Sequence, residues 1–517
     1  MKALAGVSKL ATLTLTLFIP FQLWLAENNP ISGQTAKDNK STEKNVTPKG
    51  KDPRLQSIID DIESLPPEFA ADGLIRIAQS GLVESPKDKE ELLKEAFRDA
   101  KDAQLQIKRI PYSDFGIDSR LTQGGRPIEL SLDALSLRTR AVRAMLSVNK
   151  QRARELFTSM DAPHPETLNC DDKYVYDVSS FYELLRDIAQ TTFTDSEKHR
   201  KEDLYFVKQY VDGLSSSVEL GPASNLITSM ASEQDGLLIL LPAFIRALDH
   251  LPDDDRSFTV YARNGLISDS MYGLIKKSRT QPTLRAQLKV SYRDFIVRNL
   301  NGDRCVDNTS SSKGDITGII NRFNESISAA IDQNDKDIPI ILSGDLKPSR
   351  IIPASPPIAY WQSADTKKIY DQYKALYIKP DGAKVKSDEK LRSDWQGRLS
   401  DFLTALEVWD RGTDMSEEDY FNQKSELYYR VLNIIPPVSL DYFRAFGDYL
   451  KFVADSPVQQ NNREEWFLQM TSLFERAHSL KGEDAKKARA MLSDSENWVI
   501  RMYAILEILK PTPSDHP

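Results

Sequence analysis

The chain has 517 residues, of which 40% are hydrophobic and 28% are charged, as in ordinary folded soluble proteins. A single core stops growing near roughly 250–300 residues, so this length predicts several domains or an elongated repeat array. The formal net charge is −8, and the lysines and arginines are spread along the chain. Nucleic-acid binders carry a basic field or stripe, so we expect no nucleic-acid partner.

The amino-terminal residues have the layout of an export segment. A weakly basic start is followed by an apolar stretch from Leu10 to Ala26, which is typical of a secretory signal peptide. Trp24 lies at a position before the expected cleavage site where a small residue is preferred. Residues 1–26 are therefore predicted to be a signal peptide, with an uncleaved anchor as the alternative. We expect a periplasmic or extracellular protein that touches a membrane only through this segment, if it is retained.

Four further regions are predicted from composition. Residues 27–52 are polar and contain almost no large apolar side chains, so they are expected to form a disordered tether. Helical periodicity then fills residues 53–343. Four prolines and a glycine interrupt it at residues 344–364, which we predict to be a Pro-rich loop. A second helical region is expected over residues 365–517.

Apolar residues recur at three- and four-residue steps through both helical regions. One stripe consists of Leu391, Trp395, Leu399, Phe402, Leu406 and Trp409. Only residues 337–342 suggest a strand, and Pro339 would place it at an edge. The pattern predicts an all-α fold of stacked antiparallel helical hairpins that form a curved α-solenoid-like array.

The two cysteines, Cys170 and Cys305, both lie in polar segments that break helices. Exported proteins retain disulfides, so we expect these two residues to pair. The alternative is two unrelated thiols. A bridge across so long a loop would stabilise the fold by roughly 4 kcal/mol on the chain-entropy model.

Tyr360 and Trp361 follow the Pro-rich segment and form a candidate binding lip for sugars or peptides, because aromatic side chains offer large contact areas. The alternative is that they fill a gap between helical layers. We identify no catalytic, cofactor-binding or metal-ligating residues. The dipeptide Glu325-Ser326 matches the catalytic pair of some cell-wall lyases, but Glu325 lies between stripe residues Phe323 and Ile327 and is expected to face solvent.

The segment from Leu135 to Phe157 resembles a helical-hairpin unit of the tetratricopeptide type in its alanine and leucine spacing. The chain as a whole resembles exported bacterial proteins built from an export segment, a polar tether and tetratricopeptide- or HEAT-like helices. The segments Leu65–Asp72 and Asn462–Phe467 contribute to this resemblance. The resemblance implies an α-solenoid fold and transfers no catalytic residues.

Together these features predict a non-catalytic binding or scaffolding protein of the cell envelope that acts through a helical-repeat surface. The expected partner is a protein or another envelope component, and no cofactor is expected. Two alternatives stay open, an exported hydrolase or cell-wall-active enzyme with a dispersed site, and a structural spacer without a specific ligand. A deep pocket with converging acids would favour the enzyme.

Overall fold

The structure is a computed structural model, and it describes most of the chain after residue 52. The described residues are 53–105, 107, 109–111, 131–170, 174–231, 234–263, 265–306, 312–329, 339–348, 350–353, 364–379, 381–387, 389–413, 415–437 and 439–508. The predicted export segment and tether lie outside them, as do Tyr360 and Trp361.

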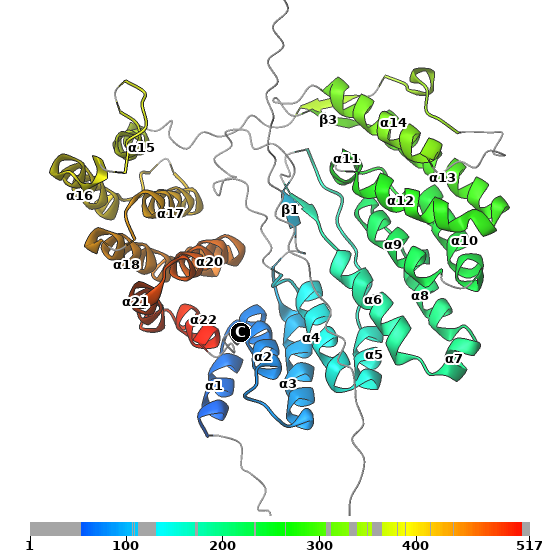
Figure 1. The fold of residues 1–517 in the computed structure, drawn as a ribbon, viewed down its shortest axis with the longest axis horizontal. Coiled ribbons are helices and arrows are strands. Elements are labelled where there is room, and N and C mark those ends of the chain that lie inside the picture. The colour runs from blue at the N-terminus through cyan, green and yellow to red at the C-terminus, as the bar shows by residue number, and fades with distance from the viewer. Residues whose placement is uncertain are drawn as a thin grey trace, which may run out of the picture. The chain divides into compact units, whose positions relative to one another are not determined.

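In these residues the chain forms 22 α-helices and four strands of three residues each, so the all-α prediction is confirmed (Figure 1). The helices up to the second cysteine are α1 Pro53–Glu63, α2 Pro67–Gln79, α3 Pro86–Asp99, α4 Ala134–Val148, α5 Lys150–Thr158, α6 Ser179–Thr192, α7 Asp195–His199, α8 Glu202–Asp212, α9 Leu220–Met230, α10 Gln234–His250, α11 Asp255–Arg263, α12 Leu266–Lys277 and α13 Pro282–Asn301.

The remaining helices are α14 Ser312–Ala329, α15 Ala364–Tyr377, α16 Ser393–Val408, α17 Glu417–Ile434, α18 Leu440–Ala454, α19 Val458–Asn461, α20 Arg463–Ser479, α21 Gly482–Ser493 and α22 Trp498–Ile508. The stripe that begins at Leu391 coincides with α16, which starts two residues later, at Ser393, and ends at Val408. None of the described helices has the length and apolar character needed to span a membrane.

The four strands pair in two small ladders. Antiparallel pairing joins β1 Arg109–Pro111 to β2 Tyr174–Tyr176, and parallel pairing joins β3 Arg304–Val306 to β4 Ile351–Pro353. The strand considered at residues 337–342 does not form where the structure describes it, since residues 339–342 have no ladder partner. Instead, the side chain of Asn324 forms hydrogen bonds with both backbone groups of Ile341.

Helices that follow one another along the chain pack together, as expected for helical hairpins. The series α2, α3, α4, α5 and α6 is in contact pairwise, and so are α15 with α16, α17 with α18 and α21 with α22 (Figure 1). A single residue, Asn149, joins α4 to α5. Its side chain accepts a hydrogen bond from the backbone N–H of Arg152, at 3.1 Å, and so caps α5.

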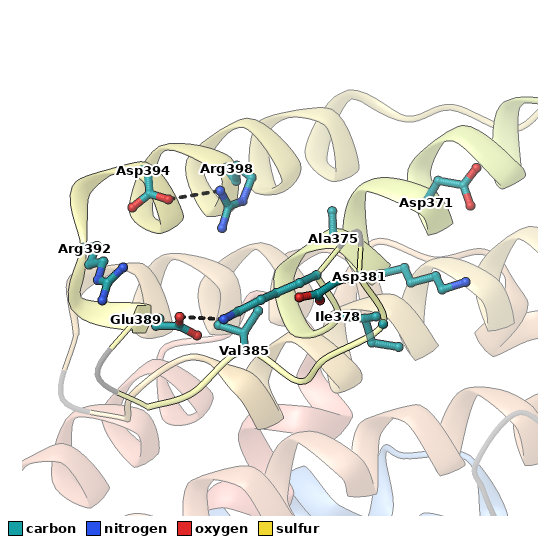
Figure 2. Close-up of a pocket in the computed structure, with 12 residues that line it drawn as sticks. Asp371, Ala375, Ile378, Asp381, Val385, Glu389, Arg392, Asp394 and Arg398 are labelled. Atoms are coloured by element: carbon teal, nitrogen blue, oxygen red, sulfur yellow. Dashed lines mark hydrogen bonds and ion pairs between the residues drawn. The ribbon is translucent and has the colours of Figure 1, made fainter.

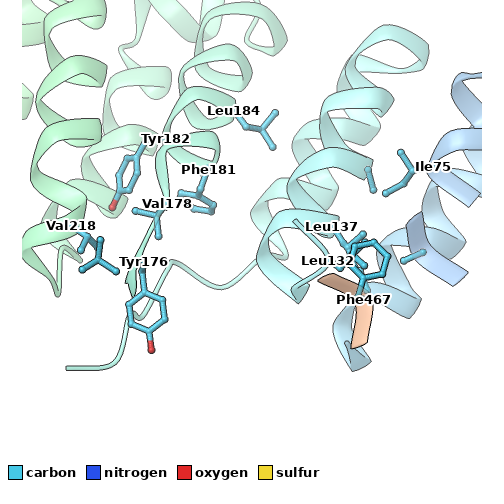
Figure 3. Close-up of a cluster of buried hydrophobic side chains, with 14 of the residues drawn as sticks. Ile75, Leu132, Leu137, Tyr176, Val178, Phe181, Tyr182, Leu184, Val218 and Phe467 are labelled. Carbon is cyan, nitrogen blue, oxygen red and sulfur yellow. The ribbon is translucent and has the colours of Figure 1, made fainter. Parts of the chain in front are cut away.

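The apolar stripes form a continuous core. Leu137, Phe157, Phe181 and Tyr182 are nearly or fully buried, and Figure 3 shows a section of this core around Leu137 and Phe181. The rings of Phe157 and Phe181 lie 5.2 Å apart between centroids, which joins α5 to α6.

Residues 52–517 group as one compact unit. Within it the last helix, α22, packs against α2, so the two ends of the helical part are neighbours. The division into two regions at residues 344–364 stays a prediction.

Candidate functional site

A pocket lies where α15 turns back towards α16. It has a volume of about 810 Å³ and is open to solvent. Charged side chains of both signs line it in equal number: Asp371, Lys374, Lys379, Asp381, Glu389, Arg392, Asp394 and Arg398. Figure 2 shows Glu389 and Arg392 at one end of the pocket and Asp371 at the other. Ala375, Ile378 and Val385 add apolar surface.

The turn between the two helices is held by backbone and side-chain hydrogen bonds. The N–H of Gly382 donates to the carbonyl of Lys379 at 2.9 Å, and the N–H of Lys379 donates to the carbonyl of Ala383 at 2.8 Å. Gly382 has φ of +85°, a conformation that side chains with a Cβ rarely adopt. Asp381 accepts a hydrogen bond from the N–H of Ala383 at 3.0 Å, which closes an Asx turn.

Each carboxylate of the pocket is already engaged. Lys379 donates to Glu389 at 2.7 Å, and Arg398 donates to Asp394 at 3.2 Å (Figure 2). Asp371 pairs with Lys367 outside the pocket. The hydrogen bonds from Lys379 and from the backbone N–H of Lys386 lower the pKa of Glu389, so this side chain stays ionised and is a poor proton donor.

A second group of charges is buried where α2, α4 and α22 meet, and we call it the ionic joint: Asp72, Arg76, Arg140 and Tyr503. The carboxylate of Asp72 accepts hydrogen bonds from Arg76 at 2.9 Å, from the Tyr503 hydroxyl at 2.6 Å, and from Arg140. Its side chain is 1% exposed. A buried charge is tolerated only when it is paired and hydrogen-bonded, and Asp72 meets both conditions.

The pKa values of the ionic joint reflect this pairing. Burial by itself raises the pKa of Asp72, but Arg140, Arg76 and the Tyr503 hydroxyl outweigh it and lower the pKa to about 2. Burial next to the Asp72 charge raises the pKa of Tyr503 well above its usual value. The carboxylate is therefore ionised and the phenol neutral at any ordinary pH, so neither group is set to exchange protons.

Further contacts next to the ionic joint connect α2 to α20 and α22. Arg76 also pairs with Glu507 of α22 at 3.1 Å, and Arg463 of α20 pairs with the fully buried Glu68 of α2 at 2.8 Å. Below the charges, the rings of Phe69 and Phe467 lie 5.5 Å apart. The ionic joint is thus a structural contact between residues more than 390 positions apart in sequence.

A smaller pocket of about 300 Å³ lies between α6, α9, α11 and α12 and is lined by Tyr182 and Tyr261, among others. Tyr182 donates to the buried Glu219 at 2.7 Å, and the N–H groups of Ser215 and Ser216 each donate to it at 2.8 Å. Burial raises the pKa of Glu219, although these hydrogen bonds oppose the shift. With both oxygens occupied, Glu219 caps the turn before α9 and faces no reacting group.

Lys424 of α17 is a buried amine, 4% exposed. It donates to the carbonyls of Trp409 at 2.7 Å and Glu407 at 3.1 Å, and to the Tyr420 hydroxyl at 3.0 Å. Burial lowers its pKa to about 8, although nearby acids oppose the shift. The ammonium satisfies carbonyls at the end of α16, so its arrangement is that of a helix cap.

Cys170 and Cys305 are joined by a disulfide, the pairing suggested by the sequence, with Cα atoms 5.3 Å apart and 135 positions between them. Arg256 of α11 donates to the carbonyl of Cys170. Asp254 caps the same helix by accepting from the N–H of Ser257 at 3.2 Å.

The other residues singled out in the sequence do not converge on a site. Glu325 is exposed on α14, as expected, and Ser326 donates to the carbonyl of Phe323 at 2.8 Å. In the part of the chain that the structure describes, no group of histidine, cysteine and acidic residues could hold a metal ion. The pocket residues were missed because charges scattered over helices and the turn between them look like ordinary solvated surface. Only the dipeptide Asp381-Gly382 stands out in the sequence, because an Asp-Gly pair is typical of a turn.

The comparisons with known proteins assign no family. No protein-family description and no curated protein matches the chain. A solved crystal structure of an engineered protein is similar over 88% of this chain and 98% of its own, at 10% identity and a TM-score of 0.24. So distant a likeness carries no argument about fold or function.

Proposed function

We propose that this protein is a non-catalytic binding or scaffolding protein of the cell envelope, and that the pocket between α15 and α16 engages a polypeptide partner. The observation that carries the proposal is the lining of the pocket. Its carboxylates are held in ion pairs or turns, and its remaining surface combines apolar and charged groups. Mixed surfaces of this kind suit recognition of another chain, where charge sets orientation and apolar contact adds affinity.

Two observations support export. The amino-terminal sequence has an apolar stretch typical of secretion signals. The disulfide between Cys170 and Cys305 is of a kind that persists in oxidising compartments and is rare in the cytosol. Thiol labelling after rapid acid quenching of intact cells tests this. Both cysteines should be blocked to the reagent without a reductant, and two free thiols would contradict export.

Site-specific photo-crosslinking in the producing cells tests the binding function. A benzoylphenylalanine at Ala375, an exposed residue that lines the pocket, should give adducts of discrete mass. The control places the same group at Gln151, an exposed residue of α5 that is far from the pocket in sequence and is not part of its lining. Identical adducts at both positions, or none at Ala375, would contradict a partner at this pocket.

A further inference from the structure

Two of the four cations that line the pocket form no ion pair with a described residue. Lys379 and Arg398 have acidic partners, Glu389 and Asp394. Lys374 and Arg392 form no ion pair and no side-chain hydrogen bond with any described residue, although the charge of Arg392 helps to lower the pKa of Glu389. Both are exposed. Three of the four acids, Asp371, Glu389 and Asp394, are in ion pairs, and Asp381 accepts from a backbone N–H. The side-chain donors that no described acid of the pocket uses belong to Lys374 and Arg392.

We propose that the pocket binds an acidic peptide segment, with Lys374 and Arg392 receiving its carboxylates. This inference rests on the proposed binding function and specifies the chemistry of the partner. A guanidinium matches a carboxylate with two parallel hydrogen bonds, and an ammonium adds a mobile point charge. Ala375, Ile378 and Val385 give apolar contact to the body of the ligand.

The same lining disfavours a polyanion such as nucleic acid. Asp371, Asp381, Glu389 and Asp394 line the pocket with four negative charges, which balance its four positive ones. A dense row of phosphates would lie against these carboxylates, and like charges at short range are repelled. A peptide can place one or two carboxylates on the unpaired cations and neutral groups elsewhere, so it fits the distribution of charge.

Fluorescence anisotropy with the full, disulfide-bonded chain tests the proposal. The probe is a labelled hexapeptide that carries two glutamates among leucine and alanine, and the matched probe has glutamine in place of glutamate. The glutamate peptide should bind, with an affinity that falls as salt is raised to about 0.5 M, because exposed charges are screened. Equal affinity for the glutamine peptide, or tighter binding of an oligonucleotide of the same length, would overturn the proposal.

The variant Lys374→Gln with Arg392→Gln removes both unpaired cations. It should weaken binding of the glutamate peptide by about tenfold or more. Its control, Lys481→Gln with Arg489→Gln, removes one exposed lysine and one exposed arginine near α21 and should bind like the parent. An unchanged affinity in the pocket variant overturns the proposal.

Crosslinking at Ala375 separates this proposal from the binding function. A discrete adduct that persists unchanged in the double pocket variant overturns the acidic ligand and leaves a partner at the pocket. Loss of that adduct together with loss of peptide binding supports both the acidic ligand and the binding function of the pocket. Peptide binding without any adduct in cells supports the ligand chemistry and overturns the cellular function.

Discussion

The ionic joint and the α15–α16 pocket are both built from acids and bases, but they use charge in opposite ways. In the ionic joint one buried carboxylate, Asp72, accepts from two guanidinium groups and a hydroxyl, and its side chain is 1% exposed. In the pocket most of the charges are exposed, and two cations, Lys374 and Arg392, form no ion pair with a described residue. Matched, buried charge indicates a structural contact, whereas unmatched charge in an open pocket indicates a place for a partner.

The disulfide gives a reference for this comparison, because it links distant segments without charge. Replacing both cysteines, Cys170→Ser with Cys305→Ser, should lower the free energy of unfolding by about 4–5 kcal/mol on the chain-entropy model. The 135-residue separation accounts for the size of the effect. Urea denaturation at low and high salt measures it. The loss should be the same at both salt concentrations, and a loss that vanishes in high salt would be inconsistent with a covalent origin.

Asp72→Asn should lower the free energy of unfolding by about 3 kcal/mol, because Arg76 and Arg140 lose the buried charge that compensates them. The matched control is Asp394→Asn, which removes the acid of an exposed pair in the pocket and should cost about 0–1 kcal/mol. Urea denaturation of both variants decides the comparison. Equal losses would show that the two charge groups do not differ in role.

Acid should weaken the ionic joint selectively. The folded-state pKa of Asp72 is about 2 and its ordinary value is 3.8, so the unfolded chain binds more protons between these values. The stabilisation is complete above about pH 5 and is lost as the pH falls through about 4 towards 2. Denaturation across this range should show a smaller pH slope in Asp72→Asn than in the parent chain. Identical slopes would count against the depressed pKa.

Tyr503→Phe removes a single neutral donor from Asp72 and leaves both arginines in place. It should lower the free energy of unfolding by about 1–1.5 kcal/mol, less than Asp72→Asn. A double-mutant cycle with Asp72→Asn should give a non-additive result, since the two side chains share one hydrogen bond. Additive losses would mean that the hydroxyl and the carboxylate act independently.

The helices could be predicted from the sequence because their signal is local. Apolar residues spaced three and four apart identify α16, and the hairpin unit expected from Leu135 to Phe157 corresponds to α4 and α5. The cysteine pairing was also accessible, because only two cysteines exist. The strands β1 to β4 were not expected, since a three-residue ladder depends on a distant partner and leaves almost no sequence pattern.

The ionic joint and the pocket could not be predicted in this way. Asp72 and Tyr503 are 431 positions apart, and nothing near either residue indicates the other. Lys374 and Arg392 look like solvated helix surface until the fold shows which neighbouring charges are already paired. The candidate site is therefore defined by which charged side chains are paired in the fold, and sequence alone does not show this pairing.

The most direct test measures stability and binding on the same samples of Lys374→Gln with Arg392→Gln. Because these cations form no ion pair and no side-chain hydrogen bond with a described residue, the unfolding midpoint should match that of the parent chain, while affinity for the glutamate peptide falls by about tenfold. A variant that keeps its full affinity, or one that loses stability as Asp72→Asn does, would contradict the assignment of the unmatched charge to a partner.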